Sequence, residues 1–305
     1  MNDSRPSQTA AWVAACRGLA GLLPPGEPIC DDPWGLRFGG RPGELLTALA
    51  RRNAKLAWRL IRQAPPIALS LYWVQLRTRA LDEMLLRFVA GGGRQILILG
   101  AGYDCRALRL ADRLAGATVF EVDHPATQKR KREILGATAA DGDKAQYVAS
   151  DFESASLRGL AAQLTALGFD PARPTFTLWE GVTMYLTEAA VSATVEAVRD
   201  LSARGSQLAI EYYQRACLAR RGRLETLLGR VGIQRREPFT FGWDPPALPG
   251  WLNSRGFTLC ADETEDIIAA RHLPPAGLSA FRKLLGEWRF HLALASRIAD
   301  EAPRH

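Results

Sequence analysis

The sequence predicts an α/β fold with a mostly parallel, doubly wound sheet of seven strands and helices on both of its faces. Three observations favour this fold. From Arg94 onward, short apolar segments bounded by turn residues alternate with segments of helical periodicity. The first apolar segment runs directly into a turn that contains two glycines, and the second ends in two acidic residues. Strand–helix units repeated with short connections are typical of parallel sheets.

Each predicted strand is a short apolar run, as expected where both faces of a sheet are covered. The helix that follows the fourth strand is expected to start with Thr187 as its N-cap. The predicted strands are residues 94–100, 117–123, 145–150, 174–181, 206–213, 256–263 and 288–296. The predicted helices between them are residues 105–114, 125–135, 154–167 and 187–203.

The chain is expected to form a single domain over residues 1–305, with four parts. Residues 1–90 are predicted to be a helical N-terminal cap, in which 71–90 form a long amphipathic helix. The core is 94–213, and 251–305 hold the final strands and helices. Between them, 214–250 combine an Arg-rich helix with a Pro- and aromatic-rich loop. Such an insertion is expected to be a lid that faces the substrate, and a loop that merely packs fits equally well.

The composition is that of an ordinary soluble protein, with 47% hydrophobic and 23% charged residues. No apolar run approaches the ~20 residues needed to cross a bilayer, and the first ten residues do not resemble a secretion signal. A cytoplasmic location is therefore expected. The five scattered cysteines lack any C-x-x-C spacing and indicate reduced thiols rather than a metal site.

The net charge of +7 raises the question of a nucleic-acid partner. Most of the basic residues are arginines in Ala/Leu-rich helical stretches, where a solvated surface is the simpler interpretation. We expect neither a nucleic-acid nor a membrane partner.

The turn after the first strand, Gly100-Ala101-Gly102-Tyr-Asp104, is the sharpest local feature. Glycines let the backbone approach a ligand where a Cβ would clash, and this position is the carboxyl edge where α/β sheets bind nucleotides. Glycines alone are weak support, since they also serve tight packing.

Acidic residues follow the next two strands. Glu121 and Asp123 end the second strand, 21 and 23 positions after Gly100, where a carboxylate can accept hydrogen bonds from both ribose hydroxyls. We expect one of the pair to enter the site and the other to point away. Asp151, followed by Phe152, ends the third strand; it fits either a hydrogen bond from an adenine amine or a helix N-cap.

The choice of cofactor rests on the third position of the glycine pattern. A dinucleotide site of the type G-x-G-x-x-G needs a glycine where this chain has Cys105. Asp104 would also lie close to the pyrophosphate, which it would repel. A ligand with a cationic sulfonium and ammonium suits that acid, so the sequence favours S-adenosyl-L-methionine (SAM), with S-adenosyl-L-homocysteine (SAH) as product.

Several segments together resemble the leucine carboxyl methyltransferase family, most of all its bacterial branch with the tetracenomycin-type polyketide O-methyltransferases. They are ILILGAGYDCRALRL, FEVDHPATQKRK, VASDF and PTFTLWEGVTMYLTEAAV, with CDDPWGLRF and LRTRALDEML upstream. The resemblance covers roughly residues 30–260, with the motifs in the family's order. It implies the Rossmann-like fold of class I methyltransferases.

The resemblance also implies roles that spacing does not reveal. Gly100, Ala101 and Gly102 would pass beneath the methionine part of SAM, and Asp123, more than Glu121, would hold the ribose. Asp151 and Phe152 would frame the adenine.

Three further residues receive roles from the resemblance. Arg77 would bind the SAM carboxylate, against the simpler interpretation of a solvent-facing helix arginine. Glu180, after the fourth strand, would lie near the amino or sulfonium end. Tyr185 would position the acceptor or simply pack.

The resemblance implies a SAM-dependent O-methyltransferase that acts on a small molecule. None of the four histidines stands in a motif that marks a catalytic base. A carboxylate or acidic phenol is therefore the favoured acceptor, because a carboxylate is already ionised at neutral pH. Three alternatives stay open: methylation of a protein C-terminus, a non-catalytic SAM-binding protein, and an NAD-dependent oxidoreductase.

Overall fold

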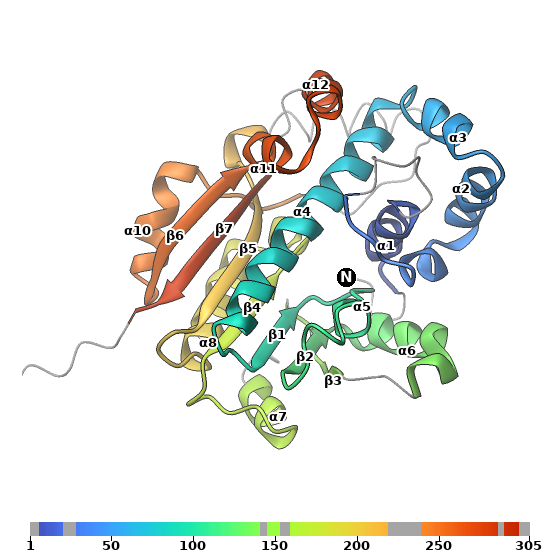
Figure 1. The fold of residues 1–305 in the computed structure, drawn as a ribbon. Helices are drawn as coiled ribbons and strands as arrows, with labels where there is room; N and C mark the ends of the chain where they lie inside the picture. Colours follow the sequence, from blue (N-terminus) through green and yellow to red (C-terminus); the bar gives the residue numbers. More distant parts are fainter. Residues whose placement is uncertain are drawn as a thin grey trace, which may run out of the picture.

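The structure, a computed structural model, describes residues 6–20, 29–140, 145–152, 159–218, 239–285 and 290–298. Its centre is a seven-stranded sheet in the order β3-β2-β1-β4-β5-β7-β6, drawn in Figure 1. The first five strands are parallel, and β7 runs antiparallel to both of its neighbours. The strands are β1 (Gln95–Leu99), β2 (Thr118–Asp123), β3 (Ala145–Ala149), β4 (Thr175–Trp179), β5 (Gln207–Tyr213), β6 (Phe257–Thr264) and β7 (Phe290–Arg297). All seven predicted strands are confirmed.

Helices connect these strands and cover both faces of the sheet. Before β1 lie α1 (Gln8–Ala20), η1 (Gly35–Phe38), α2 (Gly40–Arg52), α3 (Ala54–Ile61) and α4 (Pro65–Ala90). Within the sheet region lie α5 (Arg106–Arg109), α6 (Pro125–Ala140), α7 (Leu160–Ala166), η3 (Thr183–Tyr185) and α8 (Glu188–Asp200). After β5 lie η4 (Arg215–Cys217), η5 (Pro245–Ala247), α10 (Leu248–Asn253), α11 (Glu265–His272) and α12 (Pro275–Leu284).

Several predicted helix boundaries differ from the structure. The helix predicted at 71–90 starts six residues earlier, at Pro65, because proline is favoured in the first turn, where no backbone N–H is needed. The helix predicted at 105–114 is helical only over α5, and turns follow it. Thr187 caps α8 as predicted, accepting a hydrogen bond from the Ala190 N–H. Most of the Arg-rich helix predicted in 214–230 lies outside the described residues.

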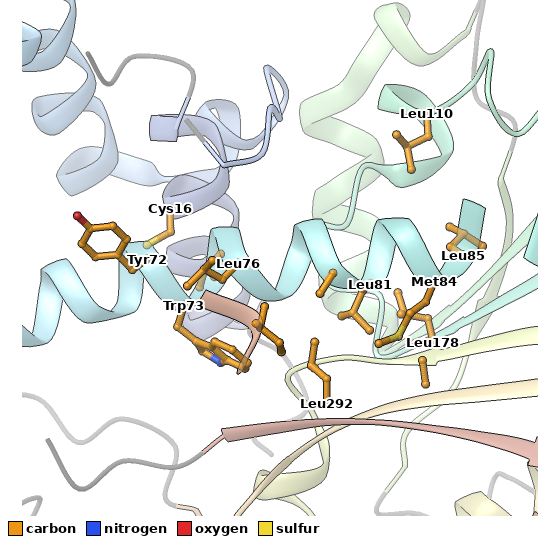
Figure 2. Packing of buried hydrophobic residues seen from close by; sticks show 14 of the residues in the cluster. Cys16, Tyr72, Trp73, Leu76, Leu81, Met84, Leu85, Leu110, Leu178 and Leu292 are labelled. Atoms are coloured by element: carbon orange, nitrogen blue, oxygen red, sulfur yellow. The ribbon is translucent and has the colours of Figure 1, made fainter. Parts of the chain in front are cut away.

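Helix α4 is the main support of one face of the sheet. Figure 2 shows Trp73, Leu81 and Met84 of this helix packed toward Leu178 of β4 and Leu292 of β7. On the opposite face, α8 and α10 cover the alternate side chains of the same strands. Both faces are therefore apolar, which explains why the strands read as continuous hydrophobic runs.

The helices before β1 pack around α4 and reach the carboxyl edge of the parallel strands. Helix α1 packs against both α4 and η1, and α3 packs against the start of α4. Among the described residues, no helix is both long and apolar enough to cross a membrane. No group of His, Cys, Asp and Glu side chains in those same ranges is arranged to hold a metal ion.

Candidate functional site

A cavity of about 580 Å³ opens at the carboxyl ends of β1, β2 and β4, beneath the start of α1. Its volume lies within the range of sites for ligands of drug or cofactor size. Nine of the ten predicted site residues line it: Arg77, Gly100, Ala101, Gly102, Asp123, Asp151, Phe152, Glu180 and Tyr185.

The glycine turn forms the floor of the cavity. Gly100 and Gly102 have φ angles of +64° and +52°, a region that favours glycine. A Cβ on Gly100 would lie 2.3 Å from Cγ2 of Val182, and one on Gly102 would lie 3.1 Å from Cβ of Ala10. Both glycines are therefore required by the fold of the turn, and together they leave bare backbone facing the cavity.

Asp123 reaches the cavity at the end of β2, and its carboxylate accepts hydrogen bonds from the backbone N–H groups of Gly102 and His124. Burial raises the pKa of this carboxyl, although those two N–H donors act in the opposite direction. A half-buried carboxylate bonded to backbone donors, with room beside it, is suited to accept hydrogen bonds from a ribose.

Glu121 is the one predicted site residue that does not line the cavity. It is buried and pairs with Lys131 of α6, which also donates to the carbonyl of Asp104. Glu121 and Asp123 are two residues apart and share a face of the strand. Depth along β2 therefore separates them, since two residues span roughly 7 Å of strand. Through Lys131, Glu121 supports the turn that contains Asp104. Glu121 is not among the proposed ligand contacts.

The end of β3 supplies the wall expected for an adenine. Ser150, Asp151 and Phe152 all line the cavity, and Phe152 is buried there. Gly159, not Asp151, precedes α7 as its N-cap. Residues 153–158 lie outside the described residues, so the interpretation of Asp151 as a cap stays untested.

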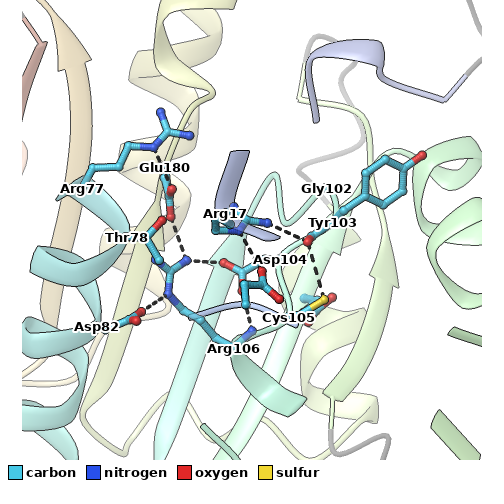
Figure 3. A network of polar contacts seen from close by, with 12 residues as sticks. Arg17, Arg77, Thr78, Asp82, Gly102, Tyr103, Asp104, Cys105, Arg106 and Glu180 are labelled. Carbon is cyan, nitrogen blue, oxygen red and sulfur yellow. Dashed lines mark hydrogen bonds and ion pairs between the residues drawn. The ribbon is translucent and has the colours of Figure 1, made fainter. Parts of the chain in front are cut away.

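Arg77 and Glu180 form an ion pair in the wall of the cavity, with Arg77 Nε 2.9 Å from Glu180 Oε1 (Figure 3). Arg77 Nη1 also donates to both oxygens of Glu211, at 2.7 Å each, and Trp73 Nε1 donates to Glu211 at 2.8 Å. Arg77 is 5% exposed, so the interpretation of a solvent-facing arginine is wrong. Its guanidinium suits a carboxylate, and the Glu180 carboxylate suits an ammonium or sulfonium.

Arg106 extends this pair into a network beneath the turn. It contacts Asp104, lies 2.7 Å from Glu180, and lies 2.7 Å from Asp82 of α4. Figure 3 shows Glu180 between Arg77 and Arg106. Arg106 is 1% exposed, which corrects the expectation that arginines in such Ala/Leu-rich stretches are solvated.

The network sets the charge of Asp104 and Glu180, two of the acids that line the cavity. Burial alone would raise the pKa of Asp104, but Arg106 and Arg17 hold it well below its ordinary value. The pKa of Glu180 is lowered in the same way, with burial opposed by Arg106 and Arg77. Both acids are therefore anionic at neutral pH, which favours a cationic group in the cavity.

Sequence reasoning missed Arg17, Arg106 and Asp104 as parts of one network. Arg17, on α1, lines the cavity and binds Asp32 at 3.0 Å and the Tyr103 carbonyl at 2.7 Å. No spacing rule joins an arginine in an N-terminal helix to a turn more than 80 residues later. In the sequence, Asp104 stands out only through its negative charge, with nothing to indicate its ion pair with Arg106.

The other end of the cavity is aromatic and neutral. Tyr185, Phe239 and Phe290 line it, and Phe239 makes edge contacts with the other two rings at centroid distances of 5.1 and 6.0 Å. Tyr213 of β5 packs on the outer side of Phe239 and Phe290. These rings form an apolar compartment of the same cavity.

The chain that follows the undescribed residues 219–238 is tied to this compartment. The Thr240 N–H donates to the Met184 carbonyl at 2.7 Å, and the Thr240 hydroxyl donates to the Leu186 carbonyl at 2.9 Å. On the other side of the gap, the Arg215 N–H donates to the Trp243 carbonyl at 2.9 Å. The Thr240 end is therefore fixed against the cavity wall, and the Arg215 end is bonded to the chain that follows the undescribed residues.

Known proteins resemble this chain over most of its length. Residues 10–199 match the sequence model of the leucine carboxyl methyltransferase family. A protein of Mycobacteroides abscessus is 32% identical over 280 residues, 88% of each chain, and one of Streptomyces coelicolor is 42% identical over 211 residues, 67% of this chain and 64% of its own. Both are provisionally named SAM-dependent methyltransferases.

A solved structure from Thermobifida fusca, provisionally described as a methyltransferase, has the same fold. Its TM-score is 0.57 at 19% identity, and the match covers 98% of this chain and 97% of that one. The cavity fits SAM as well, because bare glycine backbone, the Asp123 carboxylate and paired charges line one continuous site. The NAD-dependent alternative is set aside. The chain belongs to the leucine carboxyl methyltransferase family and is a SAM-dependent methyltransferase with the Rossmann-like class I fold.

Proposed function

We propose that this enzyme methylates an oxygen of a small, flat acceptor, a carboxylate or an acidic phenol. The observation that carries the proposal is the neutral aromatic compartment of Tyr185, Phe239 and Phe290, which adjoins the charged end of the cavity. Apolar walls with few polar groups favour an acceptor that presents a planar organic ring to them over a highly solvated molecule.

SAM supplies a methyl group already activated by its positive sulfur. The residues of the chain then have one main task, which is to align that methyl with the acceptor oxygen. Arg77 and Glu180 are proposed to fix the methionine end, and Asp123 the ribose. Asp151 and Phe152 are proposed to fix the adenine, so that the sulfur has a single position.

The acceptor oxygen is proposed to arrive ionised or to lose its proton easily. At the described positions of the aromatic compartment, 182–187, 239–240 and 290, the cavity lining has no His, Asp, Glu or Lys. A carboxylate needs no base, whereas an ordinary phenol with a pKa of about 10 gains from one. The Tyr185 hydroxyl is proposed to orient the acceptor by a hydrogen bond.

The test is product analysis after incubation of the purified enzyme with SAM carrying a labelled methyl group and a panel of aromatic carboxylates and phenols. We expect labelled product from at least one class together with equimolar SAH. Mild alkali separates the two outcomes, because methyl esters hydrolyse and methyl ethers do not. Label transferred to nitrogen or sulfur analogues but never to oxygen would overturn the proposal.

A second candidate is methylation of a protein C-terminus, which the description of the matched family favours. Peptides with a free C-terminal leucine, and their C-terminal amides as controls, belong in the same panel. Methylation of the free-acid peptide in preference to every small molecule would favour this candidate. SAH binding without any turnover across the whole panel would instead favour a non-catalytic protein.

A further inference from the structure

Large apolar side chains are concentrated on the outer surface of α2, α3 and the start of α4. Among the described residues, six large apolar side chains are exposed, and four of them lie between residues 45 and 67. Single exposed leucines are common and need no explanation, but a local group of them marks an interaction surface. The four are Leu45 (73% exposed), Leu56 (42%), Leu60 (51%) and Ile67 (37%).

The same surface is strongly basic. No Asp or Glu occurs in the sequence between Leu45 and Leu81. Five basic residues between Leu45 and Ile67 are exposed: Arg51, Arg52, Lys55, Arg59 and Arg62. We call these nine side chains the basic–apolar surface.

Helix α3 shows how the two kinds of side chain are arranged. Leu56 and Leu60 are one turn apart and form an exposed apolar ridge, and Lys55 and Arg59 form a basic ridge beside it. The helix is anchored from its other side, where Trp58 and Ile61 are buried. The exposed leucines are therefore not needed to hold α3 in place.

The basic–apolar surface is well placed to meet a large partner. Figure 1 shows α2 and α3 at the outer edge of the molecule, on the far side of α1 from the sheet. Helix α1 contacts α2 directly and also lines the cavity. A partner on this surface would thus lie close to the cavity without covering the strands.

We propose that the basic–apolar surface docks the enzyme onto the anionic surface of a lipid bilayer. Helices that lie in the bilayer interface insert apolar side chains among the acyl chains, while flanking Lys and Arg side chains contact anionic headgroups. This inference departs from the expectation of no membrane partner, which rested on the absence of apolar runs long enough to span a bilayer. Docking at the interface needs no such run.

Two other occupants fit the surface less well. A second copy of this chain would bring five exposed positive charges against five more, without a carboxylate in the same stretch to offset them. A nucleic acid would use the arginines but gains nothing from four exposed aliphatic side chains, because its backbone contacts are polar and ionic.

The experiment is co-sedimentation of the full chain with vesicles of phosphatidylcholine alone and of phosphatidylcholine mixed with phosphatidylglycerol. We expect binding to the mixed vesicles, little binding to phosphatidylcholine alone, and weakening as salt increases. Leu56→Gln combined with Leu60→Gln should weaken binding at least tenfold. Lys55→Gln combined with Arg59→Gln should weaken it about 25-fold, at about fivefold for each charge removed.

The matched control variants carry the same kinds of substitution at exposed positions outside the basic–apolar surface. Ile267→Gln removes an aliphatic side chain that is 50% exposed on α11, and Arg113→Gln with Arg173→Gln removes two exposed charges elsewhere. These variants should bind vesicles as the unmodified protein does. SAH affinity and the melting temperature should be unchanged in every variant, because each altered side chain is exposed and outside the cavity lining.

Three results would each overturn the proposal. The first is an absence of binding to the anionic vesicles. The second is binding that the control variants reduce as much as the α3 variants do. The third is a stable dimer or a duplex-DNA complex that the Leu56/Leu60 variant abolishes while vesicle binding persists, which would assign the surface to that partner instead.

Discussion

The two ends of the cavity are built on different principles. At the proposed cofactor end, Arg77, Glu180 and Arg106 are buried charges, each within 3 Å of an opposite charge. At the proposed acceptor end, Tyr185, Phe239 and Phe290 are rings in edge contact. The structure of the first end depends on a set of ion pairs that must all be present. The structure of the second end depends on how its aromatic rings fit together.

This difference has a consequence for tolerance to change. An ion removed from a buried network leaves its partner uncompensated, which is costly in an interior of low polarity. An aromatic ring replaced by another ring of similar size loses little. The cofactor end should therefore be intolerant of substitution, and the acceptor end should be adjustable.

The largest expected effect follows removal of Arg77. Arg77→Ala leaves Glu211 buried without its cation and takes one of the two arginines from Glu180, so the free energy of unfolding should fall by about 3–5 kcal/mol. Urea denaturation measures it. Arg79→Ala is the matched control two residues along α4, where the pair with Glu83 is exposed, and it should cost less than about 1 kcal/mol. Equal losses in the two variants would contradict the comparison.

The next effect concerns the ribose acceptor. Asp123→Ala should weaken SAH binding by about 1–3 kcal/mol, because charge-assisted hydrogen bonds to the ribose are lost. Titration calorimetry measures the change. Asp112→Ala, at an exposed position of the same region, should leave the affinity unaltered. A folded Asp123→Ala protein with full affinity would remove Asp123 from the site.

A pH dependence sharpens the same assignment. The ionised Asp123 carboxylate accepts from the ribose, so SAH affinity should be complete above the pKa of the free protein's carboxyl and fall as the pH drops through it. Burial raises that pKa, so the fall should begin at a higher pH than for an ordinary aspartate. The slope should be about tenfold per pH unit. Asp123→Asn should abolish this step, and an identical profile in that variant would contradict the assignment.

The smallest expected effect lies at the acceptor end. Tyr185→Phe keeps the ring against Phe239 and removes one neutral hydrogen bond, worth about 0.5–1.5 kcal/mol. We expect kcat/KM for the acceptor to fall by about 2- to 12-fold, with SAH affinity unchanged. Steady-state kinetics at saturating SAM tests this. A loss of SAH affinity would place Tyr185 at the cofactor end instead.

The sheet and most of the lining residues were predictable because they obey local rules. Strands buried on both faces are continuous apolar runs, and Gly100, Asp123 and Asp151 lie immediately after such runs. Parallel strands bring these positions to one edge, so order along the chain predicts proximity in space.

The ion network was not predictable because its partners come from distant segments. Arg106 meets Asp82 and Glu180, which lie 24 residues before it and 74 residues after it. In the sequence it is one arginine in an Ala/Leu-rich stretch, indistinguishable from a solvated one. Glu121 was expected near the ligand because it is an acid at the end of the correct strand. The sequence pattern does not reveal how far along the strand a side chain lies from the cavity, and Glu121 lies too deep to line it.

The hydrogen bonds of Thr240 and Arg215 have a consequence for the length of the insertion. They hold the two ends of the 219–238 insertion at fixed points beside Met184 and Trp243, whatever the insertion contains. Loop closure costs little more for a longer segment than for a shorter one, since the entropy grows only with the logarithm of length. Both ends are thus held independently of the length of the segment between them, so a change in that length should leave the cavity wall at Met184 and Leu186 in place.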